Sequence, residues 1–249
     1  MAGTPSGTEK MTSDHIVKSY DDELKQLNNS IIEMGGLTEA QLDAAIRALV
    51  NRDADLAYRI IDDDDRIDAL NYEVDAQAMR MLALRQPMAL DLRNVVAAIK
   101  ISADLERIAD YATNMARRTI PLTETAPLEP IHVIPRMGRL VMRMMKDVID
   151  AYVTQDADKA LDVWHADAEV DEMYVSLFRE LLTYMMEDPR RITPCTHVLF
   201  MAKNLERMGD HVTNICETIY FLVHGERFRE ERPRKTRSDR LLTDVDPQK

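Results

Sequence analysis

Pairs of acidic residues four positions apart recur along this chain of 249 residues. On a helix, side chains at that spacing share a face about one turn apart, so two like charges there repel each other. A hard cation bound by several carboxylate oxygens would relieve the repulsion, and so would a neighbouring arginine. Four pairs lie at equivalent places in two repeated segments: Asp64 with Asp68, Glu106 with Asp110, Asp167 with Asp171, and Glu206 with Asp210.

A single pair of this kind carries little weight, because the chain has 44 acidic residues and such pairs also arise by chance, as Asp158 and Asp162 illustrate. The recurrence in both halves is what favours two cation sites. Asn114 and Asn214 follow one turn later and could complete or orient the ligand shell. Ligands that are all oxygen predict a divalent or multinuclear metal, with Mg, Mn, Fe, Ca and Zn as candidates and a sulfur-seeking ion disfavoured.

The elements that would position these carboxylates are themselves repeated. Residues 98–114 match residues 198–214 with an offset of 100, and residues 53–55 match residues 156–158 with an offset of 103. A period near 100 residues is too long for one unit of a solenoid. The pattern therefore indicates a duplicated three-helix domain.

Apolar residues recur every three or four positions through most of the chain, which predicts helices rather than strands. We expect an all-α fold of two tandem, duplicated three-helix bundles with up-down helices, as in spectrin-like folds. The six predicted helices span about 14–50 with a weak or kinked middle at Gly35 and Gly36, 53–86, 90–118, 136–153, 156–186 and 196–224. The predicted segments are a disordered leader (1–13), the first bundle (14–120), a proline-rich linker that cannot be helical (121–135), the second bundle (136–226) and a flexible tail of mixed charge (227–249).

Composition excludes several classes of protein. A formal net charge of −12 would repel a nucleic-acid backbone, and the arginines of the tail are interleaved with carboxylates. The first 14 residues lack the apolar core of a signal peptide, and no run approaches the roughly 18 apolar residues of a membrane span. Cys195 and Cys216 should lie about 30 Å apart on one helix, too far for a disulfide. A cytoplasmic location follows, and no motif of an enzyme is present.

With these residues in place, the chain resembles the PhoU family, the accessory proteins of the high-affinity phosphate transporter. The resemblance covers about residues 14–230. The motifs that carry it are Met34-Gly-Gly36, Arg85-Gln-Pro-Met-Ala-Leu-Asp-Leu-Arg93, Leu105-Glu-Arg-Ile-Ala-Asp110 with Asn114, Thr183-Tyr-Met-Met-Glu-Asp188, and Leu205-Glu-Arg-Met-Gly-Asp210 with Asn214.

The resemblance implies two similar three-helix bundles and a non-enzymatic negative regulator of phosphate uptake and of the phosphate-starvation response. It implies a homodimer that links the ATPase subunit of the phosphate transporter to a membrane sensor histidine kinase. Some family members hold multinuclear metal clusters on the acidic motifs, and others are seen without metal. Ala109 stands where the second copy has Gly209, a difference that we expect to leave ligation unaffected. Two alternatives stay open: a structural helical scaffold, and a metal-dependent hydrolase using a carboxylate cluster.

Overall fold

The computed structural model describes residues 7–85 and 87–229, of which residues 7–19 and 85 are described as helix backbone only. This part of the chain contains no strand, as predicted. It forms seven α-helices and two short 3-10 helices: α1 (Gly7–Asn51), α2 (Ala54–Asp62), α3 (Asp65–Arg85), α4 (Leu90–Thr123), η1 (Glu129–His132), α5 (Val133–Thr154), α6 (Ala157–Glu187), η2 (Pro189–Arg191) and α7 (Ile192–His224).

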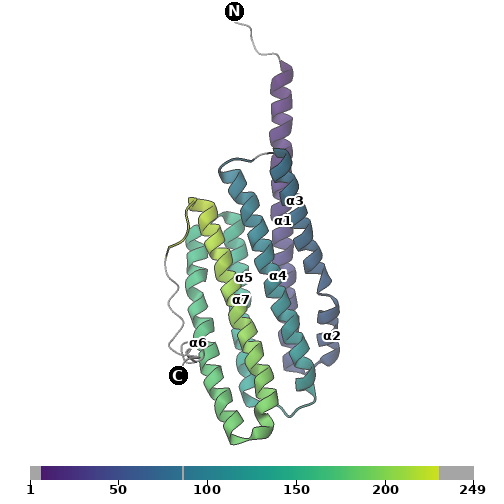
Figure 1. Cartoon of the computed structure of the whole chain (residues 1–249), viewed down its shortest axis with the longest axis vertical. Coiled ribbons are helices and arrows are strands. Elements are labelled where there is room, and N and C mark those ends of the chain that lie inside the picture. The colour runs from purple at the N-terminus through teal and green to yellow at the C-terminus, as the bar shows by residue number, and fades with distance from the viewer. Residues whose placement is uncertain (1–6, 86, 230–249) are drawn as a thin grey trace, which may run out of the picture.

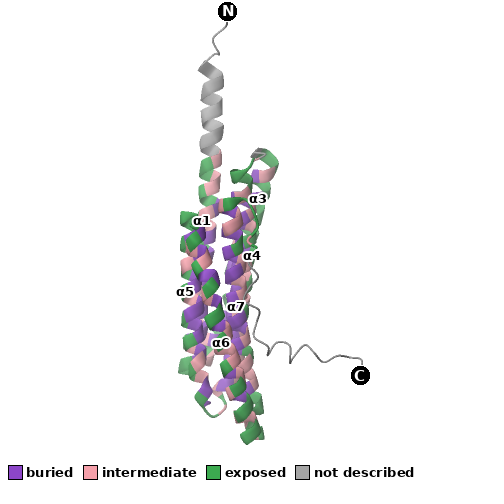
Figure 2. Ribbon diagram, turned by 90° about the vertical axis from the view of Figure 1, so that its left-hand side faces the viewer, coloured by how far each residue is buried: buried purple, intermediate pink, exposed green. Residues whose placement is uncertain are grey.

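The helices form two up-down bundles that lie side by side (Figure 1). In the first bundle the α2–α3 pair packs against both α1 and α4, which also pack against each other, and in the second α5, α6 and α7 pack together. Across the middle, α4 packs against α7 and α1 packs against α5. The buried residues of both halves form one continuous apolar core between the helices (Figure 2).

The same turn chemistry begins the second helix of each half. Asp53 Oδ1 accepts a hydrogen bond from the Leu56 N–H at 2.9 Å, and Asp156 Oδ1 accepts one from the Lys159 N–H at 2.9 Å. Both are N-caps, which satisfy backbone donors that a helix start would otherwise leave unpaired. The residue before each cap has a positive φ, 55° at Arg52 and 52° at the equivalent residue of the second half. The predicted offset of 103 thus corresponds to repeated backbone geometry.

Gly35 and Gly138 are also 103 residues apart, and each packs against an isoleucine of the other half. A Cβ built on Gly35 would lie 3.0 Å from Ile149 Cγ1, and a Cβ on Gly138 would lie 2.1 Å from Ile46 Cδ1. Ile46 and Ile149 are themselves 103 residues apart. This reciprocal pattern is what a twofold relation between two copies produces, so α1 and α5 pack as pseudo-symmetric partners.

The continuous helix that we predicted over 53–86 is wrong, because the chain breaks between α2 and α3. The break falls in the run Asp62-Asp63-Asp64-Asp65, where adjacent carboxylates repel and aspartate favours caps over helix interiors. The Asp63 N–H bonds the Arg59 carbonyl and closes α2. The equivalent stretch of the second half lacks this run, and α6 is continuous through it. The middle of α1 is likewise unbroken at Gly35 and Gly36.

Prolines interrupt the helices less than we predicted, and the linker shrinks to residues 124–132. Pro121 lies in the last turn of α4, and the helix continues through it to Thr123. Pro135 and Pro194 are the third residues of α5 and α7. At that position a backbone N–H has no partner within the helix, so its loss costs little.

The predicted disordered leader and flexible tail also need correction for those of their residues that the structure describes. Residues 7–13, assigned to the disordered leader, continue α1 as helix, whereas residues 1–6 lie outside the described part. In the tail, Phe228 packs edge-on against Trp164 and Tyr220, with ring centroids 5.1 and 5.2 Å apart. Phe228 therefore packs on the second bundle, while residues 230–249 lie outside the described part.

Candidate metal-binding faces

The first acidic face consists of Asp64, Asp68, Glu106 and Asp110. Asp64 lies in the turn before α3 and Asp68 in its first turn, while the other two residues are on α4, which packs against α3. Asp68 is an exposed residue, but partial desolvation raises the pKa of its carboxyl above the usual value, and the charges of Asp64 and Asp110 raise it further. An effect of Asp110 on Asp68 acts between helices, so the structure brings both predicted pairs of this face together.

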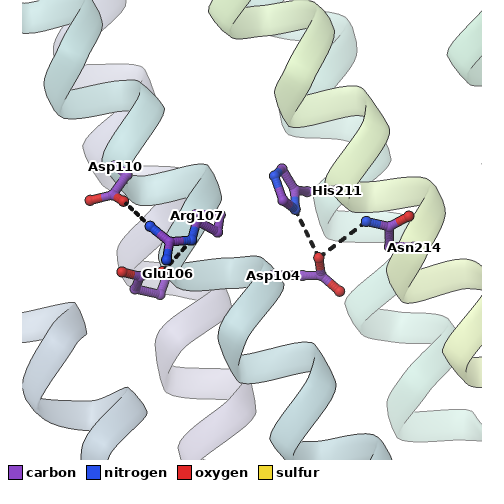
Figure 3. A network of polar contacts seen from close by, with 6 residues as sticks. All are labelled: Asp104, Glu106, Arg107, Asp110, His211 and Asn214. Atoms are coloured by element: carbon purple, nitrogen blue, oxygen red, sulfur yellow. Dashed lines mark hydrogen bonds and ion pairs between the residues drawn. The ribbon is translucent and has the colours of Figure 1, made fainter.

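The pKa of Glu106, also in the first acidic face, is raised in the same way. Burial raises its pKa first, and the charge of Asp110 adds to this, with smaller contributions from Asp68 and Asp64. Arg107 acts in the opposite direction: its Nη1 donates to Asp110 Oδ2 at 3.0 Å, and its Nε lies 3.4 Å from Glu106 Oε2 (Figure 3). The arginine alternative considered for the sequence is therefore realised in this half.

Asp64 is held by neutral donors. Gln41 Nε2 donates to its Oδ1 at 3.0 Å, and Thr113 Oγ1 donates to the same oxygen at 2.8 Å. Gln41 Nε2 also lies 2.7 Å from Thr113 Oγ1, so the three side chains form one cluster between α1, α4 and the turn before α3. Sequence reasoning singled out Asp64 but not the two donors that orient it.

The second acidic face consists of Asp167, Asp171, Glu206 and Asp210 on α6 and α7. Asp167 and Glu206 are buried, with 8% and 2% of their surface exposed. Lys203 Nζ lies 2.8 Å from Glu206 Oε2 and supplies a counter-charge. Asp167 lies directly against the backbone of α7, because a Cβ at Gly209 would be only 2.3 Å from its Oδ1. Because Gly209 has no side chain, it leaves room for this carboxylate. The sequence comparison of Gly209 with Ala109 did not reveal this role.

The donor set of both faces is all oxygen, which suits hard divalent cations. Within the described chain, however, no three His, Cys, Asp or Glu side chains are already grouped to hold an ion. For a cation to bind the first acidic face, Arg107 would have to leave Glu106 and Asp110. The metal sites therefore stay a prediction: the residues have suitable chemistry, but the described residues are not arranged as a ready-made ligand shell.

The two asparagines predicted as additional ligands have other contacts. Asn114 Oδ1 accepts a hydrogen bond from Arg117 Nη1 at 3.3 Å. Asn214 Nδ2 donates to Asp104 Oδ1 at 3.3 Å, across the packing of α4 against α7.

That contact belongs to a polar cluster that sequence reasoning missed (Figure 3). Asp104 Oδ1 also lies 2.8 Å from His211 Nδ1, whose ring is 5.7 Å from that of Tyr111. In the register of the repeat, the second copy has Asn204 where the first has Asp104. The sequence therefore contained one sign of this cluster: the first copy has a charged residue where the second copy has a neutral one.

Fold and acidic faces together define a class: an all-helical protein made of two related three-helix bundles, each with one carboxylate-rich helix face. The chain belongs to the PhoU family. The family model for the PhoU domain matches it twice, over residues 31–119 and 134–219, so each half is one copy.

Relatives of the chain agree with this assignment. It is 51% identical over 223 residues to the phosphate-specific transport system accessory protein PhoU homolog of Caulobacter vibrioides, covering 89% of this chain and 97% of that one. It is 49% identical over 228 residues to the homolog of Zymomonas mobilis, covering 92% and 94%. The crystal structure of PhoU from Pseudomonas aeruginosa superposes with a TM-score of 0.79 at 39% identity, over 83% of this chain and all of that one.

In the part of the chain that the structure describes, no helix combines the length and apolar character needed to span a membrane.

Proposed function

We propose that this protein is a cytoplasmic accessory protein of phosphate transport that restrains uptake and the phosphate-starvation response. The observation that carries the proposal is the match to the Caulobacter vibrioides relative, which bears the name phosphate-specific transport system accessory protein and is covered over 97% of its length. A structural neighbour at 31% identity is called the phosphate transport system regulatory protein PhoU from Streptococcus pneumoniae. The duplicated bundle without an enzyme motif suits a protein that acts through its surfaces.

In this proposal the protein works as an adaptor and not as an enzyme. Its partners are the ATPase subunit of the phosphate transporter and a membrane sensor histidine kinase, and it forms a homodimer. A net charge of −12 supports protein partners over nucleic acid. Light scattering at micromolar concentration tests the dimer, and a monomer throughout that range would contradict it.

Deletion of the gene followed by an assay of alkaline phosphatase in phosphate-rich medium tests the function. We expect derepressed phosphatase that the intact gene on a plasmid represses again. Unchanged phosphatase would favour a structural scaffold. The hydrolase alternative is tested on the purified protein with generic phosphoesters and added Mn²⁺, where turnover that disappears in a carboxylate variant would replace the adaptor proposal.

Each acidic face is also proposed to bind a divalent cation when its side chains rearrange around the ion. The raised pKa values of Asp68 and Glu106 support this, because clustered carboxylates that resist ionisation gain most from a positive ion. Added Mn²⁺ or Mg²⁺ should raise the melting temperature, and replacing Asp110 and Asp210 with Asn should blunt that rise. Asp162→Asn, an exposed acid on α6 outside both faces, is the matched control. Equal responses of all variants would contradict the sites.

A further inference from the structure

The C-terminal end of α1 lies at the opposite end of the molecule from the start of that helix (Figure 1). A pocket of about 500 Å³ is found there. Its walls come from the last turns of α1, the linker 124–132 and the first turns of α5. Pockets of a few hundred Å³ are the size that small organic molecules occupy. The acidic faces contribute no residue to this pocket, so it is separate from the sites discussed above.

The walls of the pocket combine apolar surface with positive charge. Leu49, Val50 and Ile131 are among the apolar residues. Val50 is 58% exposed although it is an aliphatic side chain, so the mouth of the pocket offers uncovered apolar surface. Each carbon atom that a ligand buries against an apolar wall strengthens its binding.

Three arginines line the same pocket: Arg47, Arg52 and Arg139. The lining residues, all within the described chain, include no carboxylate, although the protein carries a net charge of −12. Arg47 is paired with Asp43 at 2.8 Å, but both side chains are at least half exposed, and exposed pairs of this kind are weak. Arg139 is exposed on α5.

Arg52 has a fixed place in the wall. Its guanidinium donates to the carbonyls of Thr123 and Thr125, where α4 ends, so it is held in position without losing its charge. The start of α5 adds the positive end of a helix dipole, and the carbonyl end of α1 opposes it. The guanidinium groups therefore supply the net attraction for an anion.

We propose that this pocket binds a small organic anion, in which one phosphate or carboxylate group faces the arginines and an apolar body covers Val50 and Ile131. Inorganic phosphate is a poor fit, because it would leave the apolar wall unused. The site goes beyond the phosphate-regulatory role and does not depend on it, so either proposal can fail alone.

Ligand-observed NMR on the full-length protein tests the site with a graded set of probes. Hexyl phosphate should bind at least about tenfold more tightly than inorganic phosphate, because only the ester uses the apolar wall. It should also bind at least about tenfold more tightly than hexanol, which lacks the charge. Butyl phosphate should be weaker than hexyl phosphate by about fourfold per CH₂ group removed. Hexanoate in place of hexyl phosphate shows which anionic group the arginines prefer.

Variants place the probe in this pocket. Arg139→Gln should weaken hexyl phosphate binding about tenfold, as expected when a charge-assisted hydrogen bond is lost. Arg143→Gln, the same change one turn further along α5 and outside the lining, should leave binding unchanged. Val50→Asp puts a carboxylate at the mouth of the pocket on an exposed position, so it should abolish binding without unfolding the protein.

Met88 gives a second control, because it is 79% exposed on the distant α3–α4 turn and could attract an alkyl chain by itself. Met88→Asp should bind hexyl phosphate like the parent. The proposal is overturned if Val50→Asp binds like the parent, if Arg143→Gln weakens binding as much as Arg139→Gln, or if hexyl phosphate binds no better than inorganic phosphate.

Discussion

Asp64 in the first half and Asp167 in the second occupy equivalent positions, yet their surroundings differ. Asp64 is half-buried and accepts hydrogen bonds from Gln41 and Thr113. In the second half Met144 stands at the position of Gln41, and Asp167 is buried against the backbone at Gly209. The copies have thus kept the carboxylate and changed what surrounds it, which shows that a repeated residue need not keep a repeated environment.

The glutamates of the two faces differ in the same way. Glu106 lies beside Arg107, whose exposed side chain also pairs with Asp110, whereas Glu206 is almost fully buried beside Lys203. A cation entering the first face competes with an exposed arginine, and a cation entering the second must reach buried oxygens. We therefore expect the two halves to bind cations with different affinities.

The largest contrast between the halves should come from their equivalent glycines. Gly138→Ala should lower the free energy of unfolding by about 1–2 kcal/mol, because the new methyl group collides with the buried Ile46 and outweighs the gain in helix propensity. Gly35→Ala should be nearly neutral, since its neighbour Ile149 is only half-buried and can move. Urea denaturation measures both.

Gly36 provides the matched control for this pair. Apart from its chain neighbours and the backbone of its own helix, no atom lies within 4 Å of a Cβ added there, so Gly36→Ala should stabilise the protein by roughly 0.5–1 kcal/mol. Equal effects at positions 35 and 138 would mean that the packing of α1 against α5 is looser than described.

A smaller effect is expected at the glycine that admits Asp167. Gly209→Ala should cost about 1 kcal/mol, because the methyl group displaces the buried carboxylate while the helix itself gains stability. In an Asp167→Ala background the same change should become stabilising. A double-mutant cycle by thermal or urea denaturation isolates this coupling. Additive effects would show that Gly209 does not serve to accommodate Asp167.

The smallest effect should come from charge in the first acidic face. The pKa of Asp68 is raised in the folded state, so the folded protein holds that proton more tightly than the unfolded chain does. Stability should therefore fall as the pH rises from the pKa of Asp68 in the unfolded chain to its raised pKa in the folded protein. Above that pH the fall should level off, because Asp68 is then ionised in both states. Asp68→Asn removes the repulsion and should raise stability at neutral pH by about 0.2–0.5 kcal/mol.

That gain should shrink as the pH is lowered through the raised pKa of Asp68 toward the usual carboxyl range, because the parent then loses the same charge by protonation. Melting curves collected from about pH 4 to about pH 7 measure the trend. Asp162→Asn, at an exposed acid of α6, is the control and should change little. A gain at Asp68 that is constant with pH would rule out charge as its cause.

Much of the fold was accessible from the sequence, because helical periodicity and a repeat with constant offset are properties of residue spacing. The repeat indicated two bundles, and the family motifs agreed with it. The break at Asp63 and the helical Pro121, Pro135 and Pro194 were missed, since each depends on where a residue falls within a helix turn. Position relative to a terminus is what decides the cost of a proline, and periodicity does not fix termini to one residue.

The candidate site was accessible only in part. Spacing identified the carboxylates and their shared faces, and the structure places the two pairs of the first face within electrostatic reach of each other. Neither Gln41 nor Gly209 could be assigned a role, because their contacts depend on how α1 and α6 lie against their neighbours. Asp104 and His211 come from helices in different halves and meet only after the bundles pack.

The short linker has a consequence for how the molecule assembles. Residues 124–132 join the end of α4 to the start of α5, while packing of α4 against α7 and of α1 against α5 brings together residues about a hundred positions apart. A tether of that length keeps the halves at an effective concentration on the order of millimolar, so they dock without a bimolecular search. Cutting the chain within the linker would turn docking into an association whose extent depends on protein concentration.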